Sequence, residues 1–371
     1  MQLARWGTLL ASLVVVLLSL RIGTTSFTRS VSVMERFTKT SKEARVTLQV
    51  IETTFDSAGK KVRGRLYLPS NRDRAPGLVM VHGVHRKSID EPRLMHLATT
   101  LAESSIAVFT PEVRELADYR IESRSVQTVR DAAAYLATTL SHKGVGVMGM
   151  SFGGGLAMLA PRANRAHGEP ISFAVSIGGH CDLGRVLGFF VEGKAYNPDG
   201  SQLSLSPHPY GILVLAFKHI AELFPATDRA HAEAAIRRWL WEEHEQAEEY
   251  VAKMTPSSQT RFSALTKGEL GEMRPMFESF LRTDEPFYRD VSPCAWGEEI
   301  DVPIFALHGS GDNVIPPSES RWVAKTLPTA RDVVISHALQ HVELSHTPSV
   351  VEQTGLVQWM GNVIDETELE P

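Results

Sequence analysis

The stretch Val145-Gly-Val-Met-Gly-Met-Ser-Phe-Gly-Gly-Gly-Leu-Ala-Met-Leu-Ala160 decides the fold. Its first four residues form a short apolar run that is typical of a strand buried on both faces. A glycine-flanked serine follows in Gly149-Met150-Ser151-Phe152-Gly153, and residues 155–160 favour a helix. A serine on a sharp strand-to-helix turn can reach both a substrate and a base, and flanking glycines relieve the crowding of that turn. This order makes Ser151 the candidate nucleophile.

Short apolar runs of the same kind recur along the chain, at residues 78–81, 106–109, 173–177, 304–307 and 333–335. Before them, residues 45–52 and 62–68 flank the turn-forming Asp56-Ser-Ala-Gly59, which predicts a β-hairpin. Apolar residues at helical spacing lie between the runs, over 126–140, and after the last of them, over 351–363. Because strand and helix alternate, we expect an α/β fold with a mostly parallel central sheet flanked by helices.

One interval interrupts this alternation. From Leu183 to Asp301, 119 residues contain no convincing buried strand, so we expect a helical insertion over 183–301 between two parts of one sheet-based domain, 44–182 and 302–371. The clearest helix of the insertion is predicted over Asp228 to Met254, with apolar residues on one side and charges on the other. A second and more apolar helix is predicted over Tyr210 to Phe224.

The first 21 residues have the character of an export or anchoring segment. An uncharged, mostly apolar stretch over residues 6–20 lies between Arg5 and Arg21. It is shorter than a normal membrane span and lacks a clean A-x-A cleavage site, so a cleaved signal peptide and a retained anchor that attaches the protein to a membrane both stay open. A linker is expected over 22–43. We therefore expect the main domain to lie outside the cytoplasm, in the periplasm or the extracellular space.

Charge and cysteine content narrow the partners. The formal net charge is −5, without a basic run that could follow a phosphate backbone, so nucleic acid is not an expected partner. Cys181 and Cys294, the two cysteines, stand outside any zinc-ligand spacing, and no metal site is indicated. A disulfide between them and two buried thiols both remain open. Nothing in the sequence indicates an oligomeric state.

The serine turn also resembles a known family. Gly149-Met-Ser-Phe-Gly-Gly154 is similar to the doubled-glycine nucleophile elbow of dienelactone-hydrolase-like and prolyl-oligopeptidase-like members of the α/β-hydrolase superfamily. The resemblance covers about residues 44–182 and 302–366. It implies the α/β-hydrolase fold, with the insertion as a cap over the site, and needs no cofactor. It also implies an oxyanion hole made by the backbone N–H groups of Phe152 and of Val84, in the loop His82-Gly83-Val84-His85.

Family order places an acid after the serine and a histidine last. The segment His308-Gly-Ser-Gly-Asp312-Asn-Val-Ile-Pro-Pro317 follows the run at 304–307 and looks like the family's acid loop, which makes Asp312 the candidate acid. Asp182, which follows the preceding predicted strand, is the competing candidate because it also lies beyond a strand end. It lacks the pattern of the family's acid loop.

Three histidines follow the last predicted strand. His341 occupies the usual loop position of the catalytic base before the final helix, whereas His337 directly follows Ser336 and has little reach. His346 is expected near the start of that helix. His85 and His180 are candidates for lining the pocket.

The resemblance implies a serine hydrolase that cleaves a small-molecule carboxylic ester through an acyl-enzyme on Ser151. Phe189-Phe-Val191 and the helix over Tyr210 to Phe224 suggest an apolar acyl or alcohol pocket. A peptidase is one alternative, but the prolyl-oligopeptidase type carries a large propeller before this domain, and only about 43 residues precede the first expected strand here. An acyltransferase and an inactive, membrane-attached binding protein of the same fold are the others.

Overall fold

The structure is a computed structural model that describes residues 47–69, 75–162, 168, 170–341, 343–344 and 349–368. The predicted signal or anchor over 1–21, the linker over 22–43 and the first residues of the domain at 44–46 lie outside these ranges. Across the described ranges, no helix combines the length and the apolar character that crossing a bilayer requires.

Within the described residues, eight strands form one central sheet in the order β1-β2-β4-β3-β5-β6-β9-β10. Their bounds are β1 Leu48–Ser57, β2 Lys60–Pro69, β3 Gly77–Val81, β4 Ala107–Pro111, β5 Val145–Met150, β6 Ile171–Ile177, β9 Ile304–Gly309 and β10 Ala330–Ser336. The predicted hairpin is β1 and β2, and β2 also pairs antiparallel with β4. From β4 to β10 every pairing is parallel, as the alternating pattern predicted.

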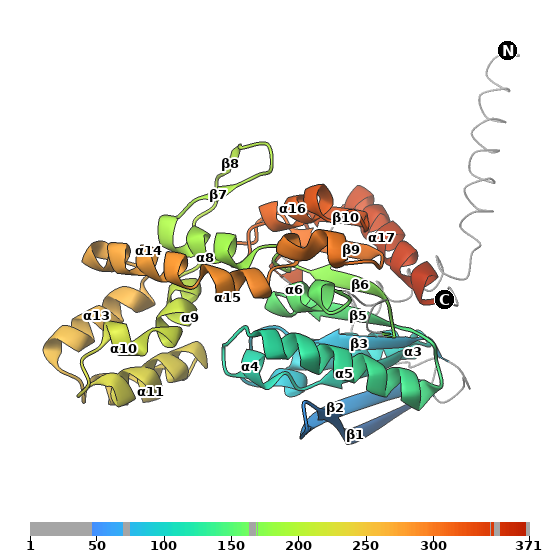
Figure 1. Cartoon of the computed structure of the whole chain (residues 1–371), viewed down its shortest axis with the longest axis horizontal. Helices are drawn as coiled ribbons and strands as arrows, with labels where there is room; N and C mark the ends of the chain where they lie inside the picture. Colours follow the sequence, from blue (N-terminus) through green and yellow to red (C-terminus); the bar gives the residue numbers. More distant parts are fainter. Residues whose placement is uncertain are drawn as a thin grey trace, which may run out of the picture.

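Alternate side chains of the strands serve different cores. On β3, Leu78 and Met80 join one apolar cluster, whereas Val79 and Val81 join another on the opposite face of the sheet. The first cluster is completed by α3 (Pro92–Glu103) and α17 (Val350–Glu368), and the second by α5 (Ser123–Leu140) and α6 (Phe152–Leu159). Helices therefore cover both faces of the sheet, which is why its inner strands β3, β4, β5 and β9 are apolar without alternation (Figure 1).

The insertion between β6 and β9 is helical, and we call residues 183–301 the cap. Its helices gather beyond one end of the sheet (Figure 1). They are α8 Leu183–Glu192, α9 Tyr210–Lys218, α10 Ile220–Leu223, α11 Arg229–Leu240, α12 His244–Val251, α13 Pro256–Thr266, α14 Arg274–Thr283, α15 Glu285–Asp290 and the short 3-10 turns η2 Gly271–Met273 and η3 Pro293–Glu299. A small two-stranded ribbon, β7 Ala195–Tyr196 with β8 Gln202–Leu203, follows α8.

The remaining short elements lie in loops of the sheet domain. Near its start they are η1 Ser88–Asp90 and α4 Arg114–Ala117, and towards its end α16 Ser318–Thr326 and the ribbon of β11 Leu339–Gln340 with β12 Glu343–Leu344.

Both helices predicted inside the cap are broken in the structure. The helix expected over 228–254 ends at Leu240 and restarts at His244, with Glu242 at a φ of 61° between them. The helix expected over 210–224 is interrupted at His219. There the imidazole stacks on Phe280 at 3.8 Å and lies 2.9 Å from an oxygen of Asp284. Contacts with α14 and the turn after it thus override the local apolar pattern.

Candidate active site

Ser151 stands on a sharp turn between β5 and α6. Its backbone has a φ of 54° and a ψ of −133°, a conformation that side chains with a Cβ rarely adopt. A Cβ at Gly149 would come within 2.0 Å of the Gly153 carbonyl oxygen, and one at Gly153 within 2.4 Å of the His82 oxygen. These contacts explain why the sequence places glycine on both sides of Ser151.

The serine opens into a cavity of about 680 Å³. Ser151, His341 and Val84 all line this cavity, between the carboxyl ends of the parallel strands and the cap. Ligands of open α/β sheets bind at this end of the strands. The structure therefore places the candidate nucleophile and the candidate base on one cavity wall, although they are 190 positions apart in the sequence.

Asp312 is completely buried and receives several hydrogen bonds. One carboxylate oxygen accepts from the backbone N–H groups of Val314 and Ile315, each at 2.9 Å. The other accepts from Nδ1 of His341 at 2.7 Å and lies 3.3 Å from Nε2 of His308. Burial alone raises the pKa of Asp312, but hydrogen bonds from His308 and His341 outweigh burial and hold its pKa well below the usual range. The carboxylate is therefore charged.

This contact sets the tautomer of His341. The Asp312 carboxylate is an acceptor, so Nδ1 of His341 carries the proton and Nε2 has a free lone pair. A histidine in this state can remove a proton from a serine hydroxyl. His341 follows the short strand β11 and has a φ of 52°, so its position depends on a tight turn.

The competing acid and bases lie elsewhere. Asp182 caps the start of α8 by accepting from the Arg185 N–H at 3.0 Å. His337 contacts Ser310 through Nδ1 at 2.8 Å and is not among the cavity residues. His180 is buried, with Nε2 2.9 Å from the Val291 oxygen, whereas His85 does line the cavity. His346 lies outside the described residues.

The loop after β3 is held by a histidine whose role the sequence did not reveal. His82 Nε2 accepts from the Val113 N–H at 3.0 Å, so Nδ1 carries the proton and donates to the Gly83 carbonyl at 2.7 Å. The N–H of Val84 belongs to the same planar peptide and points the opposite way from that carbonyl. Burial lowers the pKa of His82 to about 4, so the ring stays neutral near pH 7.

Phe152, the other expected oxyanion donor, is the first residue of α6. The first N–H groups of a helix have no partner within the helix, and they carry a partial positive charge. A substrate oxygen near Ser151 could therefore accept from the Phe152 N–H. On the opposite loop, a Cβ at Gly83 would lie 3.2 Å from Ser151 Cβ, so the two loops approach closely.

The acid loop is supported by residues that sequence patterns did not mark. His308 Nε2 also lies 2.8 Å from the Ile315 oxygen, and its Nδ1 lies 2.7 Å from the Ser320 hydroxyl. In the sequence, His308 directly follows a predicted strand and precedes Asp312 by four positions. This short spacing is the sequence feature that could have pointed to its supporting role.

The fold has counterparts among solved structures. The Pyrococcus horikoshii acylaminoacyl peptidase superimposes with a TM-score of 0.50 at 13% identity, over 88% of this chain and 42% of that one. The Pyrobaculum calidifontis esterase gives a TM-score of 0.49 at 17% identity, over 91% of this chain and 88% of that one. The chain has the α/β-hydrolase fold. It spans less than half the length of the acylaminoacyl peptidase.

A dienelactone hydrolase from Anabaena variabilis gives a TM-score of 0.44 at 13% identity, over 85% of this chain and 96% of that one. By sequence, no family model and no curated protein matches this α/β-hydrolase-fold chain. At these identities the structural likeness concerns the fold.

Proposed function

We propose that this protein is a serine hydrolase that cleaves a carboxylic ester through an acyl-enzyme on Ser151. One observation carries the proposal. Ser151, on a strained turn, shares a cavity with His341, whose Nδ1 is bonded to the buried carboxylate of Asp312. A serine hydroxyl is activated when a base lies close to it and a third group orients that base.

The reaction follows from these positions. His341 Nε2 removes the hydroxyl proton as Ser151 attacks the ester carbonyl, and Asp312 stabilises the imidazolium that forms. The N–H groups of Val84 and Phe152 stabilise the negative oxygen of the tetrahedral intermediate. His341 then protonates the leaving alcohol, and water, activated by the same ring, releases the acid.

The cavity favours substrates with an apolar group. Its part between α3 and α17 is lined by buried or partly buried apolar side chains from both helices and the strand ends, among them Leu94, Leu97, Ile177, Leu307, Leu356 and Met360. An alkyl chain transferred here from water gains about 0.8 kcal/mol per buried CH₂. Such a chamber supports an alkyl or aryl acyl or alcohol group.

Of the two cap segments expected to form an apolar pocket, only the segment that begins at Tyr210 contributes to the cavity wall. Tyr210 and Leu213 of α9 line the cavity, but Phe189, Phe190 and Val191 do not. These three are buried in the interior of the cap, where the Phe190 ring packs directly on Gly211. Their apolar character reflects packing between α8 and α9.

Labelling with a fluorophosphonate probe tests the nucleophile. We expect the wild-type protein to label and Ser151→Ala to lose both labelling and hydrolysis of p-nitrophenyl esters, by at least about 10⁴-fold in kcat. Ser263→Ala, an exposed serine on α13, is the matched control and should label normally. Failure of the wild-type protein to label, or labelling of Ser151→Ala, contradicts the proposal.

A further inference from the structure

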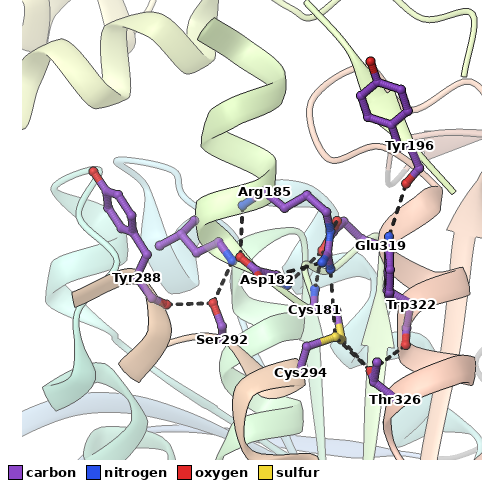
Figure 2. Close-up of polar contacts among 11 residues, drawn as sticks. Cys181, Asp182, Arg185, Tyr196, Tyr288, Ser292, Cys294, Glu319, Trp322 and Thr326 are labelled. Carbon is purple, nitrogen blue, oxygen red and sulfur yellow. Dashed lines mark hydrogen bonds and ion pairs between the residues drawn. A yellow bond between two sulfur atoms is a disulfide. The ribbon is translucent and has the colours of Figure 1, made fainter. Parts of the chain in front are cut away.

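The two ends of the cap meet at one point. Cys181, just before α8, forms a disulfide with Cys294 in η3, across 113 positions of sequence. Beside this bond, the Cys294 N–H donates to the Cys181 carbonyl at 2.9 Å. The Leu183 N–H donates to the Ser292 hydroxyl at 2.8 Å. Outgoing and returning chain are thus fastened side by side at the base of the cap (Figure 2).

A buried carboxylate of the sheet domain holds this base. Glu319 on α16 has no exposed side-chain surface. Its Oε2 accepts from the backbone N–H groups of Cys181 at 2.9 Å and Asp182 at 2.8 Å. Its Oε1 accepts from Arg185 Nε at 2.6 Å, and a second Arg185 nitrogen lies 3.1 Å from Oε2 (Figure 2). Glu319 therefore hydrogen-bonds both to the segment that leads into the cap and to α8, the first helix of the cap.

The ion pair between Glu319 and Arg185 makes the contact between α16 and the cap specific. An isolated buried carboxylate is costly, and removal of its charged partner destabilises the structure because the buried charge is left uncompensated. Arg185 is further fixed by stacking on Trp322 of α16, 4.5 Å from the ring centre. The Trp322 Nε1–H donates to the Tyr196 carbonyl of the cap ribbon at 3.2 Å. The charges therefore favour one orientation of α8 relative to α16.

The same helix also supports the acid of the active site. Ser320, the next residue after Glu319, contacts Nδ1 of His308, and the other ring nitrogen of His308 lies 3.3 Å from the Asp312 carboxylate. Consecutive residues of α16 thus contact the cap base and the acid loop. The cap in turn supplies Tyr210, Leu213 and Trp239 to the cavity wall opposite the strand ends.

We propose that Glu319 is a positioning residue which, with Arg185 and the Cys181–Cys294 disulfide, fixes the cap over Ser151 and so determines how large substrates bind. This inference rests on the proposed ester hydrolysis. Glu319 lines no part of the cavity and acts on the substrate only through the cap. Its replacement changes binding of substrates that reach the cap and leaves the chemistry at Ser151 intact.

Two esters of different length separate these effects. In Glu319→Gln, the amide keeps the size of the side chain but cannot accept from both backbone N–H groups and from Arg185. We expect KM for p-nitrophenyl decanoate to rise about tenfold, with kcat for p-nitrophenyl acetate and the fluorophosphonate labelling rate within about twofold of wild type. Glu299→Gln is the matched control, because Glu299 forms a partly exposed pair with Arg162 on the returning segment. It should leave both esters unaffected.

The double variant Cys181→Ala/Cys294→Ala removes the disulfide at the base of the cap, and the same selective rise in KM for the long ester is expected. This variant tests whether the base of the cap controls binding of the long ester even if Glu319→Gln does not fold. An equal change for both esters, or none for either, overturns the positioning role of Glu319. If the wild-type protein hydrolyses neither ester and does not label, the proposed function fails, and the positioning role falls with it.

Discussion

The contact between His341 and Asp312 gives the histidine both its tautomer and its direction. In the 2.7 Å hydrogen bond, Nδ1 of His341 donates its proton to one oxygen of the Asp312 carboxylate. The other oxygen accepts from two backbone N–H groups, so the buried carboxylate is held in one orientation. His337 is only four positions earlier, yet its ring contacts Ser310 outside the cavity wall. Proximity in sequence therefore does not decide which histidine can act as the base.

Replacement of the two histidines tests this assignment. His341→Ala should lower kcat for p-nitrophenyl acetate by about 10⁴-fold or more, because no other described histidine is paired with Asp312 at the cavity. His337→Ala, as the matched variant, should keep kcat within about threefold. Steady-state hydrolysis of the ester measures both. Near-normal turnover in His341→Ala contradicts the role given to His341.

A second residue-scale prediction concerns His82. His82→Gln removes the ring that holds the Gly83 carbonyl, so the Val84 N–H loses its fixed direction. We expect kcat to fall about 10²-fold with KM nearly unchanged, since an oxyanion donor acts mainly in the transition state. A fall in thermal stability without any change in kcat would show that the ring serves only the fold.

Sequence could identify some of these residues and not others. Ser151 was recognisable because its glycines, strand and helix are all within a few residues of it. Asp312 and His341 were nominated as acid and base from the order of the family that the chain resembles, and the structure brings the two side chains together. The roles of His82 and Glu319 depend on partners 31 and 138 positions away, so no local pattern reveals them. Choosing among the three histidines likewise needed the geometry around Asp312.

At the scale of the element, the turn between β5 and α6 depends on the absence of side chains. In Gly149→Ala the new Cβ would lie 2.0 Å from the Gly153 oxygen and 2.4 Å from its carbonyl carbon, and backbone atoms there cannot move without displacing α6. We expect the free energy of unfolding to fall by roughly 3 kcal/mol, with loss of ester hydrolysis. Urea denaturation measures the change.

Gly188→Ala is the matched glycine control. Gly188 lies inside α8, and a Cβ there would meet no atom within 4 Å. Alanine should therefore raise the free energy of unfolding by about 0.5–1 kcal/mol, through helix propensity and a less flexible unfolded chain. A Gly149→Ala variant with the same free energy of unfolding as wild type would contradict the prediction that the turn between β5 and α6 has no room for a Cβ at Gly149.

Strands were easier to predict than cap helices, for a physical reason. The inner parallel strands β3, β5, β6 and β9 are buried on both faces, so their sequences are mostly apolar whatever lies beside them. The break at His219 arises from tertiary contacts, because His219 pairs with Asp284 and stacks on Phe280, from distant parts of the chain. Periodicity alone continues a helix through such a position.

At the scale of the whole molecule, the cavity is a product of the assembled parts. Its walls come from the strand ends, α3, α17 and the cap, and no single segment contains both Ser151 and its apolar chamber. The family resemblance implied that the insertion would cover the site as a cap, but the apolar run that suggested a pocket, Phe189 to Val191, packs inside the cap. The division between packing and lining residues is set only when the helices are in place.

Acid should destabilise the whole molecule in a window set by its buried histidines. Burial lowers the pKa of His82 from 6.5 to about 4 and also lowers that of His180. Between these pH values the unfolded chain binds more protons than the folded one, so the free energy of unfolding falls as the pH is lowered. One such group contributes at most about 1.4 kcal/mol per pH unit.

Urea denaturation at pH 7, 6 and 5 should therefore show decreasing stability in the wild-type protein and a shallower decrease in His82→Gln. Equal slopes for the two proteins would mean that His82 binds a proton as readily in the folded protein as in the unfolded chain, and that Nε2 does not accept from the Val113 N–H as described.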